Sequence, residues 1–192
     1  TTVLEPEMLE KRYVLAEHKL DFRKKEDKEL KEKAIAEDKL LVNFDDVCLS
    51  RDMDKAIKNH LGSSTLLNTI EGDSEVSAFW TDEETGVECK GRFDFLTKHG
   101  VIVDLKTTTD ASYEEFKHSI TKFKYYRQAA MYIDAYKAIT GKNALGFVIV
   151  AVEKNAPYGV ACFKIDEVAI EQGRREYKAL LHKYKVFKEN DD

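Results

Sequence analysis

The sequence predicts an α/β fold in which helices flank a mixed central β-sheet that includes an antiparallel meander. Residues 75–106 show three apolar, strand-like runs separated by polar turn residues, which is typical of successive antiparallel strands. Residues 144–153 form a nearly continuous apolar run, as expected of a strand that is buried on both faces. Helical spacing of apolar residues occurs before and after these runs, and a sheet with helices packed on it defines the fold class.

The first part of the chain is expected to be helical. Residues 1–40 are mostly helical in character, and residues 18–41 are dense in charged side chains and sparse in apolar ones, which usually indicates a solvated helix face. Residues 43–60 carry apolar residues at near-helical spacing, and Asn43 is a candidate N-cap. A short helix over residues 63–70 is expected to follow Gly62.

Helices and strands alternate after the meander. Ser112 and Glu115 form a candidate capping box at the start of a helical region. A helix over residues 122–140 is expected to end before Gly141, because glycine commonly follows the last helical residue. The remaining predicted elements are one strand and a terminal helix, over residues 158–165 and 166–187.

Length and composition indicate one domain. The 192 residues include only two prolines and no linker-like stretch, so we expect a single domain over residues 1–192. Within it, residues 1–70 form a helical N-terminal part and residues 71–192 form the core. The net charge of -5 counts against a protein that coats DNA through general basicity, although a local basic channel can still bind phosphate groups.

The cysteines and the apolar runs also indicate the compartment. The three cysteines are far apart and odd in number, which favours neither a disulfide framework nor a paired metal site. A cytoplasmic protein is therefore expected. No stretch reaches membrane-spanning length, so no membrane partner is expected, and the N-terminus has no signal-peptide layout. The start without methionine suggests a fragment or a processed chain.

Two aspartates interrupt an otherwise apolar hairpin at residues 91–106. The loop between the two strands is Lys-His-Gly, and a three-residue hairpin loop commonly ends in a residue with positive φ, which suits glycine. If Thr97 pairs with Val101, Asp94 lies opposite Asp104. Strict alternation then places Phe93 with the other apolar residues on one face and the aspartates on the opposite face.

Such a pair of aspartates predicts a metal site. Directly opposed side chains lie roughly 5 Å apart at Cβ. Two carboxylates that close repel each other, and a hard divalent cation bound by oxygen atoms relieves the repulsion. The alternative is that Asp94 and Asp104 are surface residues on a solvated sheet face. The apolar neighbours on both strands favour the metal site, because an unpaired carboxylate in an interior strand is costly.

The order of polar residues resembles a known family. Glu75 is followed by Gly-Arg-Phe-Asp ending at Asp94, by Asp-Leu-Lys at residues 104–106, and by Gln-Ala-Ala-Met-Tyr at residues 128–132. This order resembles the PD-(D/E)XK nucleases, and within them the RecB-like branch. Residues 70–150 are most similar to the RecE-type exonuclease (exonuclease VIII), a relative of lambda exonuclease. The resemblance implies a restriction-endonuclease-like core.

The resemblance also implies roles for the residues of the hairpin. Asp94 and Asp104 would hold Mg²⁺, for which Mn²⁺ can substitute, with the Leu105 carbonyl as an additional oxygen ligand. Lys106 would orient the attacking water and stabilise charge. Glu75 would bind a second metal directly or through water, and it shares a sheet face with Asp94 if Trp80 faces Val87. The alternative for Glu75 is an ordinary surface residue at the start of a strand.

The helix after the hairpin is the candidate DNA-binding surface. Gln128 and Tyr132 are four residues apart and share a helix face, which in the related family approaches the DNA. Lys122, Lys124 and Arg127 interleave with aromatic residues just before them, as in a surface that follows phosphates. The alternatives are core packing for the tyrosines and an ordinary solvated face for the charges.

One departure from the family concerns a histidine. Members of this type carry a metal-ligating His on a helix upstream of a segment that here begins at Leu4, so that helix is expected before Thr1. His18 and His60 are poor substitutes, because a lone His near a helix end is usually structural or solvated. A Cas4-like iron–sulfur nuclease is not expected, since four ligating cysteines are absent.

The implied activity is a metal-dependent, ATP-independent exonuclease. It would degrade linear double-stranded DNA from 5′ ends and leave 3′ single strands for phage-type recombination. The resemblance implies a homo-oligomeric ring and a single-strand annealing protein of RecT type as partner. No phosphate-binding loop of the ATPase type occurs, consistent with ATP independence. The alternatives are a restriction-like or RecB-type endonuclease module, and an inactive DNA-binding or assembly module with the same fold.

Overall fold

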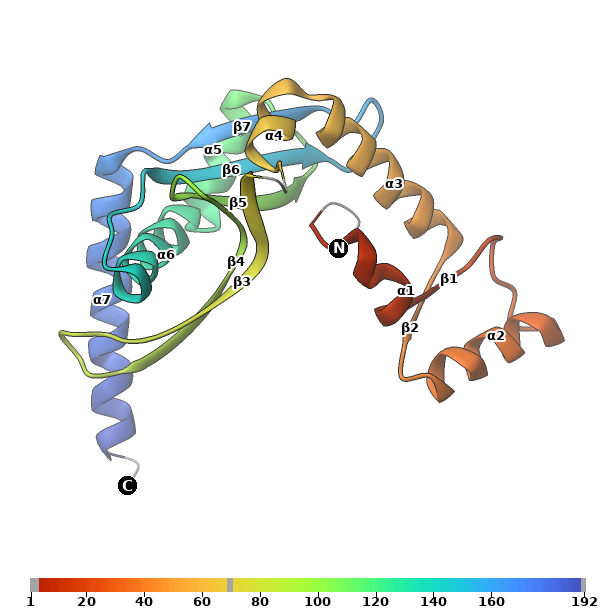
Figure 1. Ribbon diagram of the computed structural model, residues 1–192, viewed down its shortest axis with the longest axis horizontal. Helices are drawn as coiled ribbons and strands as arrows, with labels where there is room; N and C mark the ends of the chain where they lie inside the picture. Colours follow the sequence, from red (N-terminus) through yellow and green to blue (C-terminus); the bar gives the residue numbers. More distant parts are fainter. Residues whose placement is uncertain (1–3, 69–70, 191–192) are drawn as a thin grey trace.

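A mixed β-sheet with helices on both sides forms the centre of the molecule (Figure 1). The computed structural model describes residues 4–68 and 71–190. Within these residues the main sheet has the strand order β3-β4-β5-β6-β7, with β5 and β6 parallel and the other neighbours antiparallel. The predicted fold class is therefore confirmed. The strands are β3 Gly72–Thr81, β4 Glu88–Thr97, β5 Val101–Thr108, β6 Gly146–Glu153 and β7 Val160–Lys164.

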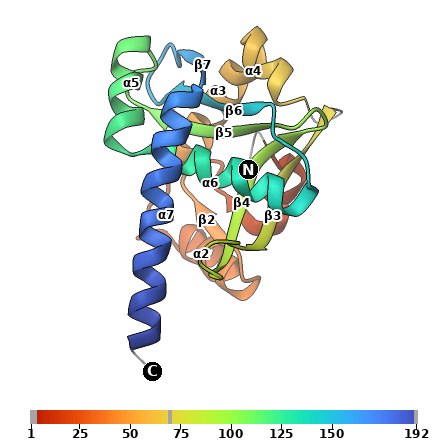
Figure 2. The ribbon, with the colours of Figure 1, turned by 90° about the vertical axis from the view of Figure 1, so that its left-hand side faces the viewer.

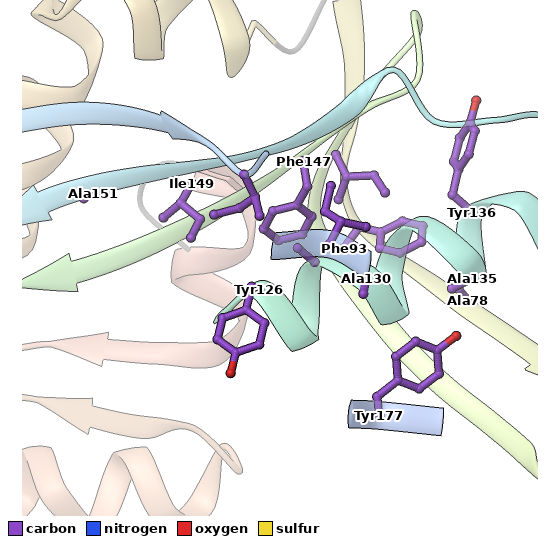
Figure 3. Close-up of a cluster of buried hydrophobic side chains, with 14 of the residues drawn as sticks. Ala78, Phe93, Tyr126, Ala130, Ala135, Tyr136, Phe147, Ile149, Ala151 and Tyr177 are labelled. Atoms are coloured by element: carbon purple, nitrogen blue, oxygen red, sulfur yellow. The ribbon is translucent and has the colours of Figure 1, made fainter. Parts of the chain in front are cut away.

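Three helices cover one face of this sheet. Helices α5 (Tyr113–Lys122) and α6 (Tyr125–Thr140) make the crossover that a parallel strand pair requires, and α7 (Glu167–Asn190) follows β7. Figure 3 shows apolar side chains gathered between the sheet and α6, and the alanines of α6 allow the close approach. The largest fully buried members of this cluster are Phe93, Ile102, Phe116, Phe147 and Ile149.

The opposite face carries a second, smaller core. Phe95, Val103 and Val150 are fully buried there against Leu4, and the helical segment α4 (Leu61–Leu66) contributes Leu66. None of the helices in the part of the chain that the structure describes is long and apolar enough to cross a membrane.

The N-terminal part contains short strands that the sequence did not predict. β1 and β2 form a parallel pair of three residues each, beside the expected helices. Asn43 lies at the predicted N-cap position of α3, but its side chain does not cap the backbone. α4 begins at Leu61, so Gly62 lies inside it, and residues 69–70 of the expected helix are outside the described residues. The elements are a 3₁₀ turn Pro6–Met8, α1 Leu9–Arg12, β1 Tyr13–Leu15, α2 Lys25–Ala36, β2 Leu40–Val42 and α3 Phe44–Asn59.

Two predicted helix boundaries in the second half of the chain match the structure in position. Ser112 is the N-cap of α5, although its side chain makes no capping hydrogen bond, so the predicted capping box does not form. α6 ends at Thr140 and is followed by Gly141 with φ 70°, as predicted. α6 begins at Tyr125 rather than at Lys122, because α5 extends to Lys122 and a turn separates the two helices.

The register of the β4–β5 hairpin agrees with the prediction, but the predicted faces are partly wrong. Phe95 pairs with Val103, the register in which Thr97 lies opposite Val101, and Gly100 has φ 83°. Phe93 and Phe95, however, lie in different cores. The strand is therefore irregular at the intervening Asp94, and strict alternation does not hold across it.

The β3–β4 pairing differs from the predicted register by two residues. Trp80 pairs with Cys89 rather than with Val87. Ladder pairing is interrupted at Glu75, whose φ of 54° is left-handed, a conformation that costs a non-glycine residue roughly 1–2 kcal/mol. Ser74 pairs with Phe95 and Val76 with Phe93, so the observed register still sets Glu75 across from Asp94, although these two residues form no ladder pair themselves.

Helix α7 packs closely on α6, and a network of charged side chains joins the two helices. The Arg174 guanidinium contacts both carboxylate oxygens of Asp134, with Nε–Oδ2 and Nη2–Oδ1 distances of 2.8 Å each. The Tyr177 hydroxyl also donates to Asp134, and burial together with this bond raises the pKa of Tyr177. Beside this network, Gly173 lies directly on the backbone of Tyr126 in α6. The sequence pattern did not predict the contact between Gly173 and Tyr126.

The tip of the β3–β4 hairpin lies beside α7 (Figure 2). A buried ion pair between Asp82 and Lys178 joins the two elements. Asp82 is 4% exposed and pairs with Lys178, and the same carboxylate accepts hydrogen bonds from the Thr85 hydroxyl (2.7 Å) and amide (3.0 Å). Burial opposes ionisation of Asp82, but Lys178 and Thr85 outweigh it, so the pKa of Asp82 lies below its usual value.

We expect Lys178→Met to destabilise the protein by about 3 kcal/mol at neutral pH, because it leaves a buried carboxylate unpaired. Since the folded-state pKa of Asp82 is lowered, the stabilisation is present above the unfolded-state pKa, near 4, and is lost as the pH falls through the folded-state value. Urea denaturation at pH 7 and at pH 3 measures this. The control Lys185→Met removes an exposed pair with Glu189 and should cost less than about 0.5 kcal/mol. Equal losses for the two variants, or a loss at Lys178 that is undiminished at pH 3, would contradict the expectation.

Candidate active site

Asp94 separates β4 from β5 at the centre of the sheet. Backbone pairing between the two strands ends at Phe95 and Val103. At the next position, Asp94 Oδ2 accepts a hydrogen bond from the Leu105 amide at 2.8 Å. The carboxylate thus replaces a main-chain carbonyl as acceptor, and the two strands diverge beyond it. The sequence placed Asp94 opposite Asp104 but gave no indication of this hydrogen bond.

The divergence leaves main-chain oxygen facing the same gap. In an extended strand, the amide and the carbonyl of one residue point to the same side. Because the Leu105 amide points to Asp94, the Leu105 carbonyl points toward β4 as well, beyond the last strand pair. The Leu105 carbonyl thus lies on the β4 side of β5, and its role as an additional metal ligand stays a prediction.

Asp104 is a buried carboxylate next to this gap. It is 1% exposed, and its Oδ1 accepts a hydrogen bond from Gln128 Nε2 at 2.6 Å. Its Oδ2 forms an ion pair with Lys106 but receives no hydrogen bond of acceptable geometry from the described residues. Burial raises the pKa of Asp104, Lys106 opposes the rise, and the nearby Asp94 carboxylate adds to it. A second cation beside both carboxylates would favour the ionised forms of this pair.

Lys106 connects the carboxylates to an aromatic surface. Its side chain is 22% exposed, and its Nζ lies 5.1 Å from the ring centroid of Tyr125. A cation within about 6 Å of a ring is attracted to the ring face. Lys106 is thus held between Asp104 and Tyr125 with part of its side chain accessible to solvent.

Glu75 lies on the neighbouring strand and is engaged elsewhere. Its Oε2 is 2.7 Å from Arg92 Nε, and its side chain is 15% exposed. Among residues 4–68 and 71–190, no three His, Cys, Asp or Glu side chains converge so as to hold a metal ion. A second-metal role for Glu75 therefore requires a rearrangement of this ion pair, and that role stays a prediction.

The predicted DNA-binding residues are divided between the site and its surroundings. Gln128 reaches Asp104 directly, whereas Tyr132 packs edge-on against Phe93, with ring centroids 5.2 Å apart. Lys124 Nζ contacts the Tyr126 hydroxyl at 2.8 Å and Glu176 at 3.8 Å, so its charge is partly neutralised. Lys122 is exposed and Arg127 is half-buried.

Comparison with known proteins identifies the family. The family model described as a PDDEXK-like domain of unknown function, DUF3799, matches residues 2–192. The chain belongs to this family. It therefore belongs to the PD-(D/E)XK superfamily, and its Asp-Leu-Lys sequence at residues 104–106 is the candidate for the Asp-x-Lys element of that superfamily.

One solved structure shows the same fold. The DUF3799 domain is similar to the crystal structure of a predicted exonuclease from Eubacterium rectale, with a TM-score of 0.57 and 17% sequence identity over 81% of this chain. The chain spans 57% of the length of that protein. A second structure, SSO0001, has a TM-score of 0.38 and 13% identity, with 83% of this chain and 66% of that chain covered, a similarity too low to support an argument. A search of curated proteins gives no match.

The oxygen atoms of the DUF3799 domain site fit a divalent cation. PD-(D/E)XK nucleases typically use divalent metals, and the donors here are the carboxylates of Asp94 and Asp104 and the Leu105 carbonyl, all of the hard oxygen type that Mg²⁺ and Mn²⁺ prefer. The buried Asp104 Oδ2 is paired with Lys106 but receives no hydrogen bond of acceptable geometry from the described residues, and the nearby Asp94 carboxylate adds to the rise in the pKa of Asp104. A bound cation would add positive charge beside these two carboxylates.

The sequence did not predict the positions of three residues near the site. Tyr125 lies against Lys106, Phe123 stacks on Tyr125, and Glu176 of α7 reaches Lys124. The cluster of aromatic and basic residues at positions 122–127 indicated this segment in general terms. The contact with Glu176 joins residues 52 positions apart in sequence, and only the packing of α7 on α6 shows it.

Proposed function

We propose that this chain is a Mg²⁺-dependent nuclease that hydrolyses phosphodiester bonds of DNA. The observation that carries the proposal is the arrangement of Asp94, Asp104 and Lys106 around a gap between two diverging strands. Metal-assisted phosphodiester hydrolysis uses groups of these kinds: two buried or half-buried carboxylates, a main-chain oxygen and the ammonium group of a partly exposed lysine.

Each residue then has a defined task. Asp94, Asp104 and the Leu105 carbonyl would hold the cation, which supplies stabilisation of the negative charge that develops on the phosphate. Gln128 fixes the orientation of Asp104 through its 2.6 Å hydrogen bond. Lys106, held by Asp104 and Tyr125, donates hydrogen bonds to the attacking water and to a phosphate oxygen. Lys122 and Arg127 attract the DNA backbone.

The preferred substrate in this proposal is linear double-stranded DNA, degraded from 5′ ends without ATP to leave 3′ single strands for recombination. The support is the similarity of residues 70–150 to the RecE-type exonuclease. The same similarity supports a homo-oligomeric ring that encloses the duplex and a single-strand annealing protein of RecT type that receives the product. Cytoplasmic location is part of the same proposal.

The decisive experiment compares linear and covalently closed circular DNA of one sequence. We expect the chain to digest the linear form with Mg²⁺ alone and to leave closed circles intact, because a ring must be entered by a duplex end. Release of labelled nucleotides from 5′-labelled and 3′-labelled ends, at fixed low salt, reports the direction. Cutting of closed circles at a similar rate would support the restriction-like or RecB-type alternative. Failure to cut either DNA across Mg²⁺ and Mn²⁺ titrations would support the inactive DNA-binding module.

A further inference from the structure

A row of aromatic rings leads from the core to the surface beside Lys106. Phe163 stacks on Phe116 with ring centroids 4.6 Å apart, and Phe116 lies 6.3 Å from Tyr125. Tyr125 is stacked in turn on Phe123, at 5.6 Å and an interplanar angle of 27°. Phe116 is 1% exposed, whereas Phe123 at the outer end is 56% exposed. The row thus ends in solvent, where one further flat group could stack.

The backbone places Phe123 at this outer position. α5 ends at Lys122 and α6 begins at Tyr125, so Phe123 and Lys124 form the whole connection between the helices. Lys124 has φ 58° and ψ 37°, a left-handed conformation that lysine rarely adopts. Non-glycine residues in such conformations occur preferentially at ligand-binding and catalytic sites. Here the left-handed residue turns the chain between the two stacked rings.

The exposed ring is flanked by positive charge. Lys122 Nζ lies 5.3 Å from the Phe123 ring centroid, and Lys106 Nζ lies 5.1 Å from that of Tyr125. Lys106 is also the ion-pair partner of Asp104. The Phe123–Tyr125 pair therefore lies one side chain away from the carboxylates at which phosphate is expected to bind. Aromatic faces interleaved with lysines are the recurring elements of single-strand binding surfaces.

We propose that Phe123 and Tyr125 form a stacking platform for an unpaired base of the DNA strand that is cut. The inference rests on the proposed nuclease function and adds a requirement to it. A base can reach Phe123 only if it has left its complementary strand, so the productive substrate has at least one opened base pair at the site. Lys122, displaced from the ring by the base, then pairs with a neighbouring phosphate. Because every base has a π-face, the platform gives little sequence preference.

The test is a double-mutant cycle between the protein and the DNA. Binding of a fluorescent duplex with a short non-complementary 5′ end is measured by anisotropy, with Ca²⁺ in place of Mg²⁺. A second DNA is identical but abasic at the non-complementary nucleotides. We expect Phe123→Ala to weaken binding of the first DNA about tenfold and of the abasic DNA less than about twofold. Phe123→Trp should bind the first DNA at least as tightly as the wild type does.

Tyr113→Ala is the matched control. Tyr113 is 65% exposed and also has a lysine over its ring, with Lys117 Nζ 5.8 Å from the centroid, but it lies at the other end of α5. Its loss should weaken both DNAs by the same small factor. Equal weakening of both DNAs by Phe123→Ala, with normal cleavage by the wild type, would overturn the stacking platform and leave the nuclease proposal standing. A wild type that neither binds nor cuts either DNA would overturn both.

Discussion

Asp104→Asn is expected to abolish DNA cleavage and leave the fold intact. The amide still accepts the hydrogen bond from Gln128, so the side chain keeps its position, but it no longer supplies an anionic ligand. Loss of the several kcal/mol that a bound cation contributes to the transition state corresponds to a decrease in kcat of roughly a thousandfold or more. Gel assays of linear duplex DNA with Mg²⁺ measure this effect.

Thermal unfolding of the same variant separates catalysis from folding. Without metal, Asp104→Asn should be more stable than the wild type by about 1 kcal/mol, because a buried carboxylate near Asp94 is replaced by a neutral group. Added Mg²⁺ should raise the Tm of the wild type and not that of the variant. Asp73→Asn, an exposed position on β3, is the control and should change neither property. Near-normal hydrolysis by Asp104→Asn would refute the assignment of this site.

Gly173→Ala is expected to destabilise the protein, although alanine is the better helix former by about 1 kcal/mol. A Cβ at position 173 would lie 2.3 Å from the carbonyl oxygen and 2.8 Å from the carbonyl carbon of Tyr126. The neighbour is backbone, which cannot turn aside, so the overpacking cost lies at the upper end of its usual range, about 3 kcal/mol. The net loss of about 2 kcal/mol should lower the Tm by about 4–8 °C.

The same variant should also lower cleavage, because α6 must shift and Gln128 lies two residues beyond Tyr126 on that helix. Gly141→Ala is the control. Its Cβ meets nothing within 4 Å, and its φ of 70° makes alanine cost roughly 1–2 kcal/mol without touching the site. A gain in stability for Gly173→Ala, as at a solvent-exposed helix position, would show that α7 does not pack on α6 in this way.

The sequence predicted the parts of the site that depend on local order. The hairpin loop ending at Gly100, the register that opposes Asp94 to Asp104, and the Asp-x-Lys spacing all follow from periodicity over fewer than 20 residues. The family resemblance also pointed to Gln128, which lies beside Asp104. Its DNA-binding role stays a prediction, and its hydrogen bond to Asp104 was not predicted from the sequence.

The remaining differences have physical causes that a pattern of residue types does not record. Asp94 bonds to a main-chain amide, which makes the strand irregular and separates Phe93 from Phe95. The β1–β2 pair contains three residues on each strand, too few to show a period of two. The contact of Gly173 with Tyr126 joins segments that are distant in sequence. A glycine within a helix ordinarily lowers helix stability, so its presence in the sequence does not indicate a close helix contact.

The hydrogen bond between Asp94 and Leu105 has a consequence for the order of folding. It spans 11 residues within a single hairpin, whereas the bond between Gln128 and Asp104 spans 24 and requires α6 to pack against β5. Hairpins form in microseconds, and pairing across long connections is slower. The carboxylates of Asp94 and Asp104 should therefore come together before α6 packs on the sheet and Gln128 orients Asp104. Divalent ions present during refolding would meet a partly assembled binding site, and would accelerate folding if both carboxylates are already opposed in the transition state.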